Sequence, residues 1–138
     1  MPAERALLTL ALATVLLGAG CIGAPTAPGA GETGVSDEAA TNRALAAEER
    51  YIASALSNAD CVDSWGTAPT ITQKEATVVE RGGEGVLVEV QHPFSYSTET
   101  TTEDGRNESI HADGATEATY RVTADGTERV SGTGLSPC

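Results

Sequence analysis

Two histidines are the side chains whose chemistry could serve catalysis or metal binding. His92 lies on the apolar positions of an alternating segment, which favours a buried structural imidazole over a general base. His111 lies between Glu108 and Asp113, and an imidazole beside carboxylates can bind a divalent cation. Because the spacing matches no defined metal motif, a solvated acidic loop is the favoured interpretation. We therefore expect no metal ion and no other cofactor.

Other chemical signatures in the sequence are few. No serine lies in a Gly-x-Ser-x-Gly pattern, and the glycines of 82–85 lie between two predicted strands, not between a strand and a helix. Trp65 is the only tryptophan, and we expect it to cover the end of the core beside Cys61, with ligand stacking as the alternative. Asn107 begins the sequon Asn-Glu-Ser and is a glycosylation candidate. Nothing here predicts an enzyme.

The N-terminal segment predicts export. Residues 1–5 form a short polar head, and residues 6–17 are almost wholly apolar. That length suits a signal peptide and is shorter than the roughly 20 residues that span a bilayer. The small residues 18–20 then precede Cys21, whose thiol can be alkylated by a lipid. We expect residues 1–20 to be a signal peptide and Cys21 to be the lipidated first residue of the mature chain.

This segment resembles the lipobox of prokaryotic lipoproteins, whose usual form is Leu-Ala-Gly-Cys. Ala19, Gly20 and Cys21 match that form, whereas Gly18 stands where leucine is expected. The resemblance implies a lipid anchor on Cys21 that holds the chain at the external face of the cell membrane. An uncleaved N-terminal anchor and a fully released secreted protein are the alternatives, and all three export the rest of the chain.

The composition resembles that of haloarchaeal secreted proteins. The 138 residues include 20 acids and 8 bases, for a net charge of -12, and Lys74 is the only lysine. Carboxylates keep a protein solvated when high salt strengthens hydrophobic association and screens charge. The same acid excess, with scattered bases, speaks against nucleic acid as a partner.

Two cysteines remain once Cys21 is assigned to lipidation. Cys61 and Cys138 form an even pair in an oxidising location, which predicts a disulfide. It would hold the segment around Cys138 against the end of a predicted helix, and closing so long a loop contributes about 4 to 5 kcal/mol in the chain-entropy model. No Cys-x-x-Cys motif and no adjacent histidine supports a redox or metal role.

The remaining pattern predicts a small α+β domain over 37–138, after a lipidated Gly/Pro-rich linker at 21–36. Ser36 can cap a helix over 37–59. We expect this one N-terminal helix to pack on a four-stranded antiparallel meander, in two layers. The predicted strands are 71–81, 86–96, 116–122 and 129–133, with a connector at 60–66, a polar loop from Glu99 to Asp113 and a hairpin turn at Asp125-Gly126.

Alternation within the predicted strands indicates which face the helix covers. The apolar positions on that face are Val86, Val88, Val90, Phe94, Tyr120 and Val122. Pro93 cannot donate to a neighbouring strand, so the strand bends, bulges or lies at a sheet edge near Pro93. On the helix, Leu45, Ile52, Leu56 and Ala59 recur at helical spacing, whereas Glu48, Glu49 and Arg50 are expected away from this stripe.

Every clear feature of the sequence is explained by export, membrane anchoring, a disulfide or solubility. The preferred hypothesis is a surface lipoprotein whose domain is a binding or envelope-interaction module with a protein partner. The second hypothesis is a small-ligand or cation-binding protein that uses Trp65 or the 99–113 segment. A hydrolase that uses His92 or His111 is the third.

Overall fold

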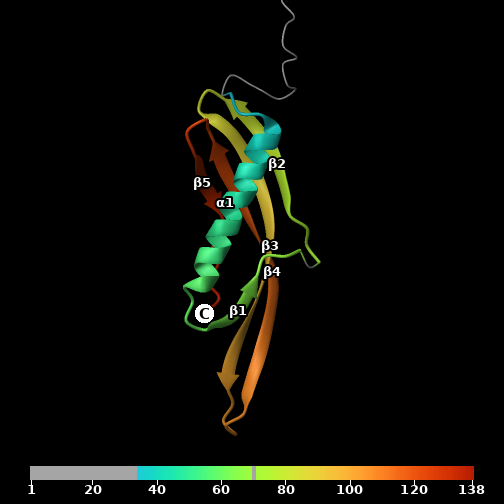
Figure 1. The fold of residues 1–138 in the computed structure, drawn as a ribbon, viewed down its shortest axis with the longest axis vertical. Helices are drawn as coiled ribbons and strands as arrows, with labels where there is room; N and C mark the ends of the chain where they lie inside the picture. The colour runs from blue at the N-terminus through green and yellow to red at the C-terminus, as the bar shows by residue number, and fades with distance from the viewer. Residues whose placement is uncertain (1–33, 70) are drawn as a thin grey trace, which may run out of the picture.

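The computed structural model describes residues 34–69 and 71–138 (Figure 1). In these parts of the chain, one helix is followed by five strands, so the fold is α+β. The predicted signal peptide and Cys21 lie outside the described residues. The elements are α1 (Asp37–Ser57), β1 (Val62–Gly66), β2 (Glu75–Gly82), β3 (Gly85–Thr101), β4 (Asn107–Val122) and β5 (Thr127–Gly132).

Helix α1 begins where the sequence predicts and ends before Ala59. The side chain of Ser36 accepts a hydrogen bond from the Ala39 amide at 3.1 Å, which caps the first turn. The helix lies along one face of the sheet, as Figure 1 shows. Its buried side chains recur at every fourth residue and form one row toward the sheet: Ala40, Ala44, Glu48, Ile52 and Leu56.

The prediction that Glu48 lies away from the sheet is wrong. Its side chain is 0% exposed. One carboxylate oxygen, Oε2, accepts hydrogen bonds from the Tyr120 hydroxyl at 2.7 Å and from Arg129 Nε at 3.0 Å. The Arg129 guanidinium also lies 4.1 Å from the centre of the Tyr51 ring. A buried carboxylate is tolerated here because hydrogen bonds from the sheet and the guanidinium of Arg129 compensate its charge.

Strands β3 and β4 form the centre of an antiparallel sheet. They pair without a register shift from Val86 opposite Val122 to Thr101 opposite Asn107. β5 pairs with the other edge of β4, from Ala118 onward, and both β1 and β2 pair with the other edge of β3. The helix and this sheet make the two predicted layers.

Pro93 falls between the two strands that share one edge of β3. The β2 ladder ends at Gln91, and the β1 ladder begins at Ser95. Alternate residues of a strand point their main-chain groups to the same side, so Pro93 points its nitrogen into this gap and not toward β4. The prediction that this strand lies at an edge near Pro93 is wrong, because β3 is central. Pro93 is accommodated because neither β1 nor β2 pairs with β3 at that position.

The predicted count of four strands is wrong, because residues 62–66 are a strand and not a connector. β1 pairs through its main chain with Ser95 to Thr98 and has no apolar alternation to reveal it. The predicted polar loop at 99–113 is also wrong in extent. β3 and β4 continue through most of it, and residues 102–106 form the turn, closed by the Thr102 amide on the Arg106 carbonyl at 2.8 Å.

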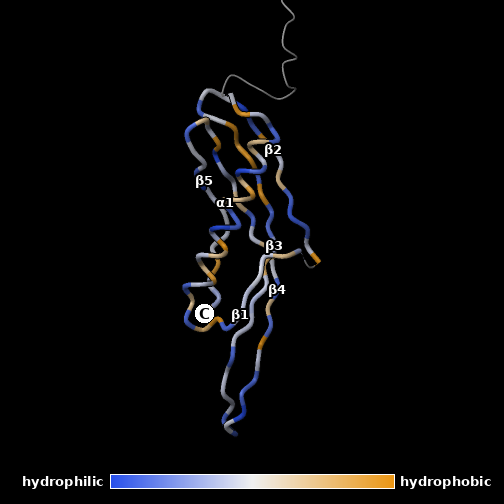
Figure 2. Tube along the Cα trace, in the orientation of Figure 1, coloured by the Kyte–Doolittle hydropathy of each residue, from blue (hydrophilic) through white to orange (hydrophobic). Residues whose placement is uncertain are grey.

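The core lies between α1 and the part of the sheet next to the β2–β3 and β4–β5 turns. Its buried residues are Val35, Ala40, Ala44, Val86, Val88, Val90, Ala118, Tyr120 and Val122. The predicted face is confirmed except for Phe94, which is only partly buried. Figure 2 shows apolar residues concentrated where α1 covers the sheet, whereas the far ends of β3 and β4 are mostly hydrophilic.

Residue Val35 belongs to the folded unit. It is buried in the core, and Arg81 Nη1 donates to its carbonyl at 2.9 Å. Arg81 also pairs with the Asp37 carboxylate. The end of the predicted 21–36 linker is thus held at the start of α1.

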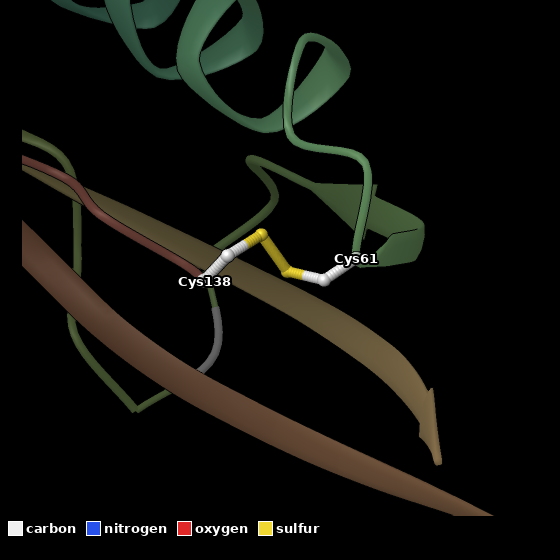
Figure 3. Close-up of a disulfide and its surroundings, with 2 residues drawn as sticks. All are labelled: Cys61 and Cys138. Carbon is white, nitrogen blue, oxygen red and sulfur yellow. A yellow bond between two sulfur atoms is a disulfide. The ribbon is translucent and has the colours of Figure 1, made fainter. Parts of the chain in front are cut away.

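The predicted disulfide between Cys61 and Cys138 is confirmed (Figure 3). The two Cα atoms are 6.0 Å apart across a sequence separation of 77 residues. The bond joins the turn after α1 to the segment after β5. Along that segment, the Leu135 amide also donates to the Tyr51 hydroxyl at 3.2 Å. Over 34–69 and 71–138, no helix is long and apolar enough to cross a membrane.

Candidate functional site

The surface residues that could bind a ligand or take part in a reaction lie mainly at the far ends of β3 and β4. We call residues 95–117, which contain these ends and the turn between them, the distal hairpin. Figure 1 shows it extending past the end of α1, and β5 pairs with β4 only from Ala118 onward. On the other side, β1 pairs with the hairpin as far as Thr98. Much of the distal hairpin is therefore a two-stranded ribbon.

A surface depression of about 410 Å³ lies where β1 meets the distal hairpin. Its lining includes Ser64, Trp65, Tyr96, Ser97, His111 and Asp113. These residues lie on β1, β3 and β4, and strand pairing makes them neighbours, because Trp65 is opposite Tyr96 and Ser97 is opposite His111. Side chains alternate between the two faces of a sheet, so those of Trp65 and Tyr96 point to the other face from those of Ser97 and His111.

The polar side of this depression has the residue types of a hydrolase but not the contacts. The hydroxyls of Ser64 and Ser97 bond to each other at 2.6 Å. Within the described residues, the His111 imidazole has no hydrogen bond to either hydroxyl or to Asp113. Nucleophilic catalysis by serine requires a base in contact with the hydroxyl. The geometry gives no support to the hydrolase hypothesis.

The other face of the same strands carries an apolar strip. Trp65, Tyr96 and Ala112 are neighbours across three strands, and Trp65 is 43% exposed. Ile110, two residues from Ala112 on the same face, is 55% exposed. Trp65 is therefore part of this exposed strip, which corrects the expectation that it covers the end of the core.

Phe94 and Gly114 extend this strip toward the core. The Phe94 and Tyr96 rings are stacked, with centroids 6.2 Å apart. Gly114 lies opposite Phe94, and a Cβ at Gly114 would lie 2.6 Å from the tip of the Phe94 ring. The glycine therefore allows the ring to lie flat across β4.

The second depression, about 590 Å³, lies on the face of the sheet away from α1. Its lining includes Glu75, Glu89, Gln91, Glu117, Thr119 and Ser131. The alternation that buries the valines under the helix turns these polar side chains to solvent. The described residues contain no group of three or more histidine, cysteine or acidic side chains that could hold a metal ion.

The cation candidate from the sequence does not assemble. Glu108 lies on one face of β4, whereas His111 and Asp113 lie on the other, since side chains alternate along a strand. The polar loop that could have folded them around an ion is instead extended. Nearby, Asn107 is the first residue of β4, and its side-chain oxygen accepts from the Thr101 hydroxyl at 3.0 Å. Its exposed position suits a glycosylation site.

His92 is buried, as predicted, and does not line either depression. Nδ1 lies 3.0 Å from the Pro93 carbonyl, and Nε2, which has no hydrogen bond, lies 3.7 Å from Glu49 Oε2. Glu49 also accepts from Thr67 at 3.0 Å and Lys74 at 3.2 Å, and these two bonds lower the pKa of its carboxyl. The cluster fastens Thr67 and Lys74 to α1.

Sequence reasoning missed the charged network around Glu48. Burial by itself would raise the pKa of Glu48, but hydrogen bonds from Arg129, Thr116 and Tyr120 hold it below its ordinary value. Burial and the neighbouring Glu48 raise the pKa of Tyr120 above its usual range. The only sign of it in the sequence is that Glu48 is spaced by four residues from Ala44 and Ile52, which are buried helix positions.

Comparison with protein-family models, with curated proteins and with solved structures gives no match for this chain. The distal hairpin offers an exposed apolar strip, a polar face and long stretches of strand edge. Such a surface suits binding to another macromolecule better than bond-breaking chemistry.

Proposed function

We propose that the chain is an exported, lipid-anchored binding module of the cell envelope, with the distal hairpin as its interaction surface. The observation that carries the proposal is the ribbon formed by β3 and β4 beyond α1 and β5. A two-stranded ribbon is marginally stable in water and buries little apolar area. Ile110 on this ribbon and Trp65 on the neighbouring β1 are exposed, and a partner that covered them would bury their apolar surface.

The proposed location outside the cytoplasm has separate support. The disulfide between Cys61 and Cys138 suits an oxidising compartment outside the cytoplasm. The apolar segment before Cys21 would direct export as a signal peptide, and a lipid on Cys21 would anchor the chain in the membrane. Mass spectrometry of the mature N-terminus tests this. We expect a peptide that begins at a lipid-modified Cys21, and an intact Met1 would contradict cleavage.

The proposed role is tested by crosslinking on intact cells. A photo-reactive amino acid is placed at Ile110 in one variant and at Val79, on β2, in a control variant. The two native side chains have similar exposure, 55% and 48%. We expect a discrete protein adduct from position 110 and none from position 79. Equal labelling from both positions, or no adduct from 110, would contradict a binding role for the hairpin.

Small-ligand binding is the second candidate, and the exposed Trp65 beside Tyr96 favours it. An exposed indole next to a phenol is a stacking surface for a flat or sugar-like molecule. This candidate predicts no protein adduct at position 110. It also predicts that Trp65→Ser removes solute binding while the hairpin stays folded.

A further inference from the structure

The outer edge of β4 in the distal hairpin has no strand beside it. Thr133 bonds to both main-chain groups of Glu117, so Glu117 points outward from β3. The β3–β4 ladder has no register shift, so from Glu117 to the turn every second residue of β4 points its main-chain N–H and C=O groups away from β3. They are Asn107, Ser109, His111, Asp113 and Ala115. In the part of the chain that the structure describes, β5 reaches only to Ala118.

This edge lacks most of the usual protection against strand pairing. Natural edges are blocked by charged side chains, lysine above all, and by proline, bulges or short length. β4 runs for 16 residues and has neither proline nor lysine, and its ladder with β3 has no bulge. The edge is thus long, straight and able to accept another strand.

The charge of the distal hairpin selects what can pair there. Residues 95–117 contain six carboxylates and one arginine, a net charge of -5 with histidine neutral. That arginine, Arg106, already pairs with Asp104 at 3.0 Å. A second copy of the chain would bring the same negative charge against the edge, and like charges repel. A positively charged strand is attracted instead.

The two faces beside the edge differ. Ile110 and Ala112 lie on one face, and His111 and Asp113 lie on the other. Side chains of an added strand alternate between the same two faces. One set would meet the apolar strip and the other would meet carboxylates, including Glu117.

We infer that the outer edge of β4 from Asn107 to Ala115 binds an extended segment of a partner protein that alternates basic and apolar residues. The segment adds a strand to the sheet. Its main chain bonds to the outward groups, its basic side chains face Asp113 and Glu117, and its apolar side chains cover Ile110. This deepens the proposed function and rests on it, because it names the chemistry of the partner.

The test uses the folded protein and a synthetic peptide of about seven residues that alternates valine and arginine, which spans roughly 20 Å as a strand. We expect saturable binding that weakens about tenfold between about 0.1 M and about 1 M salt. The matched peptide with N-methyl groups on alternate residues keeps its charge but cannot pair, and we expect no binding. A peptide that alternates valine and glutamate is also expected not to bind.

Protein variants locate the binding edge. His111→Pro removes one outward amide and no bond to β3, and His111→Ala keeps that amide. We expect the proline variant to bind about tenfold more weakly than the alanine variant, the effect of one to two hydrogen bonds. Asp113→Asn is expected to weaken binding severalfold. Its control, Asp125→Asn in the β4–β5 turn, is expected to leave affinity unchanged.

Equal binding of the plain and N-methylated peptides would overturn strand addition, and that readout does not depend on how any variant folds. No binding of the plain peptide would also overturn it. The crosslink at position 110 on intact cells would still report on the proposed function. An adduct at position 110 without peptide binding contradicts strand addition and supports the binding module. Peptide binding without an adduct supports strand addition and contradicts the proposed binding role on intact cells.

Discussion

At the residue scale, the most consequential contact is the one between Glu48 and Arg129. The Glu48 carboxylate is fully buried between α1, to which it belongs, and the sheet. The guanidinium that neutralises it comes from β5. Removing one partner of a buried pair leaves the other charge without compensation, which costs far more than the net gain from the pair. The side chain is therefore a constraint on how α1 sits on the sheet.

Replacing Arg129 by methionine should lower the free energy of unfolding by about 3 kcal/mol, because Glu48 then loses its buried counter-charge. Urea unfolding measures this. The control is Arg121→Met, which removes a more exposed pair with Glu128 at 3.6 Å and should change stability by less than about 1 kcal/mol. Equal effects of the two variants would contradict a buried role for Glu48.

The same carboxylate makes stability depend on pH. Its pKa is lower in the folded chain than the ordinary 4.5, so the unfolded chain binds the proton more tightly. The stability that this group supplies is complete above pH 4.5 and is lost as the pH falls through the lower folded pKa. We expect the stability advantage of the native chain over Glu48→Gln to shrink on acidification. An advantage that stays constant from pH 7 to pH 3, measured by urea unfolding, would refute this.

Single residues were predictable where the signal is local. The Ser36 cap and the burial of His92 follow from neighbours in sequence. Glu48 was not predictable, because it sits beside Glu49 in a polar run and its partner Arg129 is 81 positions away. Only the fold brings the two together.

At the element scale, the disulfide decides how the last segment is held. Thr133 bonds to Glu117 and Leu135 bonds to Tyr51, and the disulfide joins Cys138 at the end of this segment to the turn after α1. The double variant Cys61→Ala, Cys138→Ala should be less stable by about 2 to 5 kcal/mol in thermal or urea unfolding. A reductant should lower the stability of the native chain and leave that of the variant unchanged. If the reductant also leaves the native chain unchanged, the bond carries no stability.

The strands show where sequence patterns stop being informative. Most of β3 and the end of β4 under the helix were predictable, since apolar residues alternate there and one face is buried. β2 was predictable from its β-branched residues and from the glycine turn that follows it. β1 and most of the distal hairpin were not, because most of their side chains are exposed and no apolar alternation marks them as strands. The register of β3 on β4 extends the pairing into sequence that otherwise resembles a loop.

At the scale of the whole molecule, net charge governs the response to salt. The chain carries a charge of -12, so like charges crowd together in the folded state. Stability should rise between about 0.1 M and about 2 M potassium chloride, by at least about 1 kcal/mol, or roughly 4 to 8 °C in the melting temperature. Equal melting temperatures at both salt concentrations would contradict the halophilic interpretation.

The distal hairpin is the feature on which the proposed binding role depends, and amide exchange of the free protein tests it most directly. Amides of Ile110, Ala112 and Gly114 point to β3 and should exchange slowly, whereas those of Ser109, His111 and Asp113 point outward and should exchange fast. This alternation along β4, read residue by residue by NMR, is the predicted result. Uniformly slow exchange would mean that the edge is already covered, and uniformly fast exchange would mean that the hairpin does not form; either would contradict a free edge that awaits a partner.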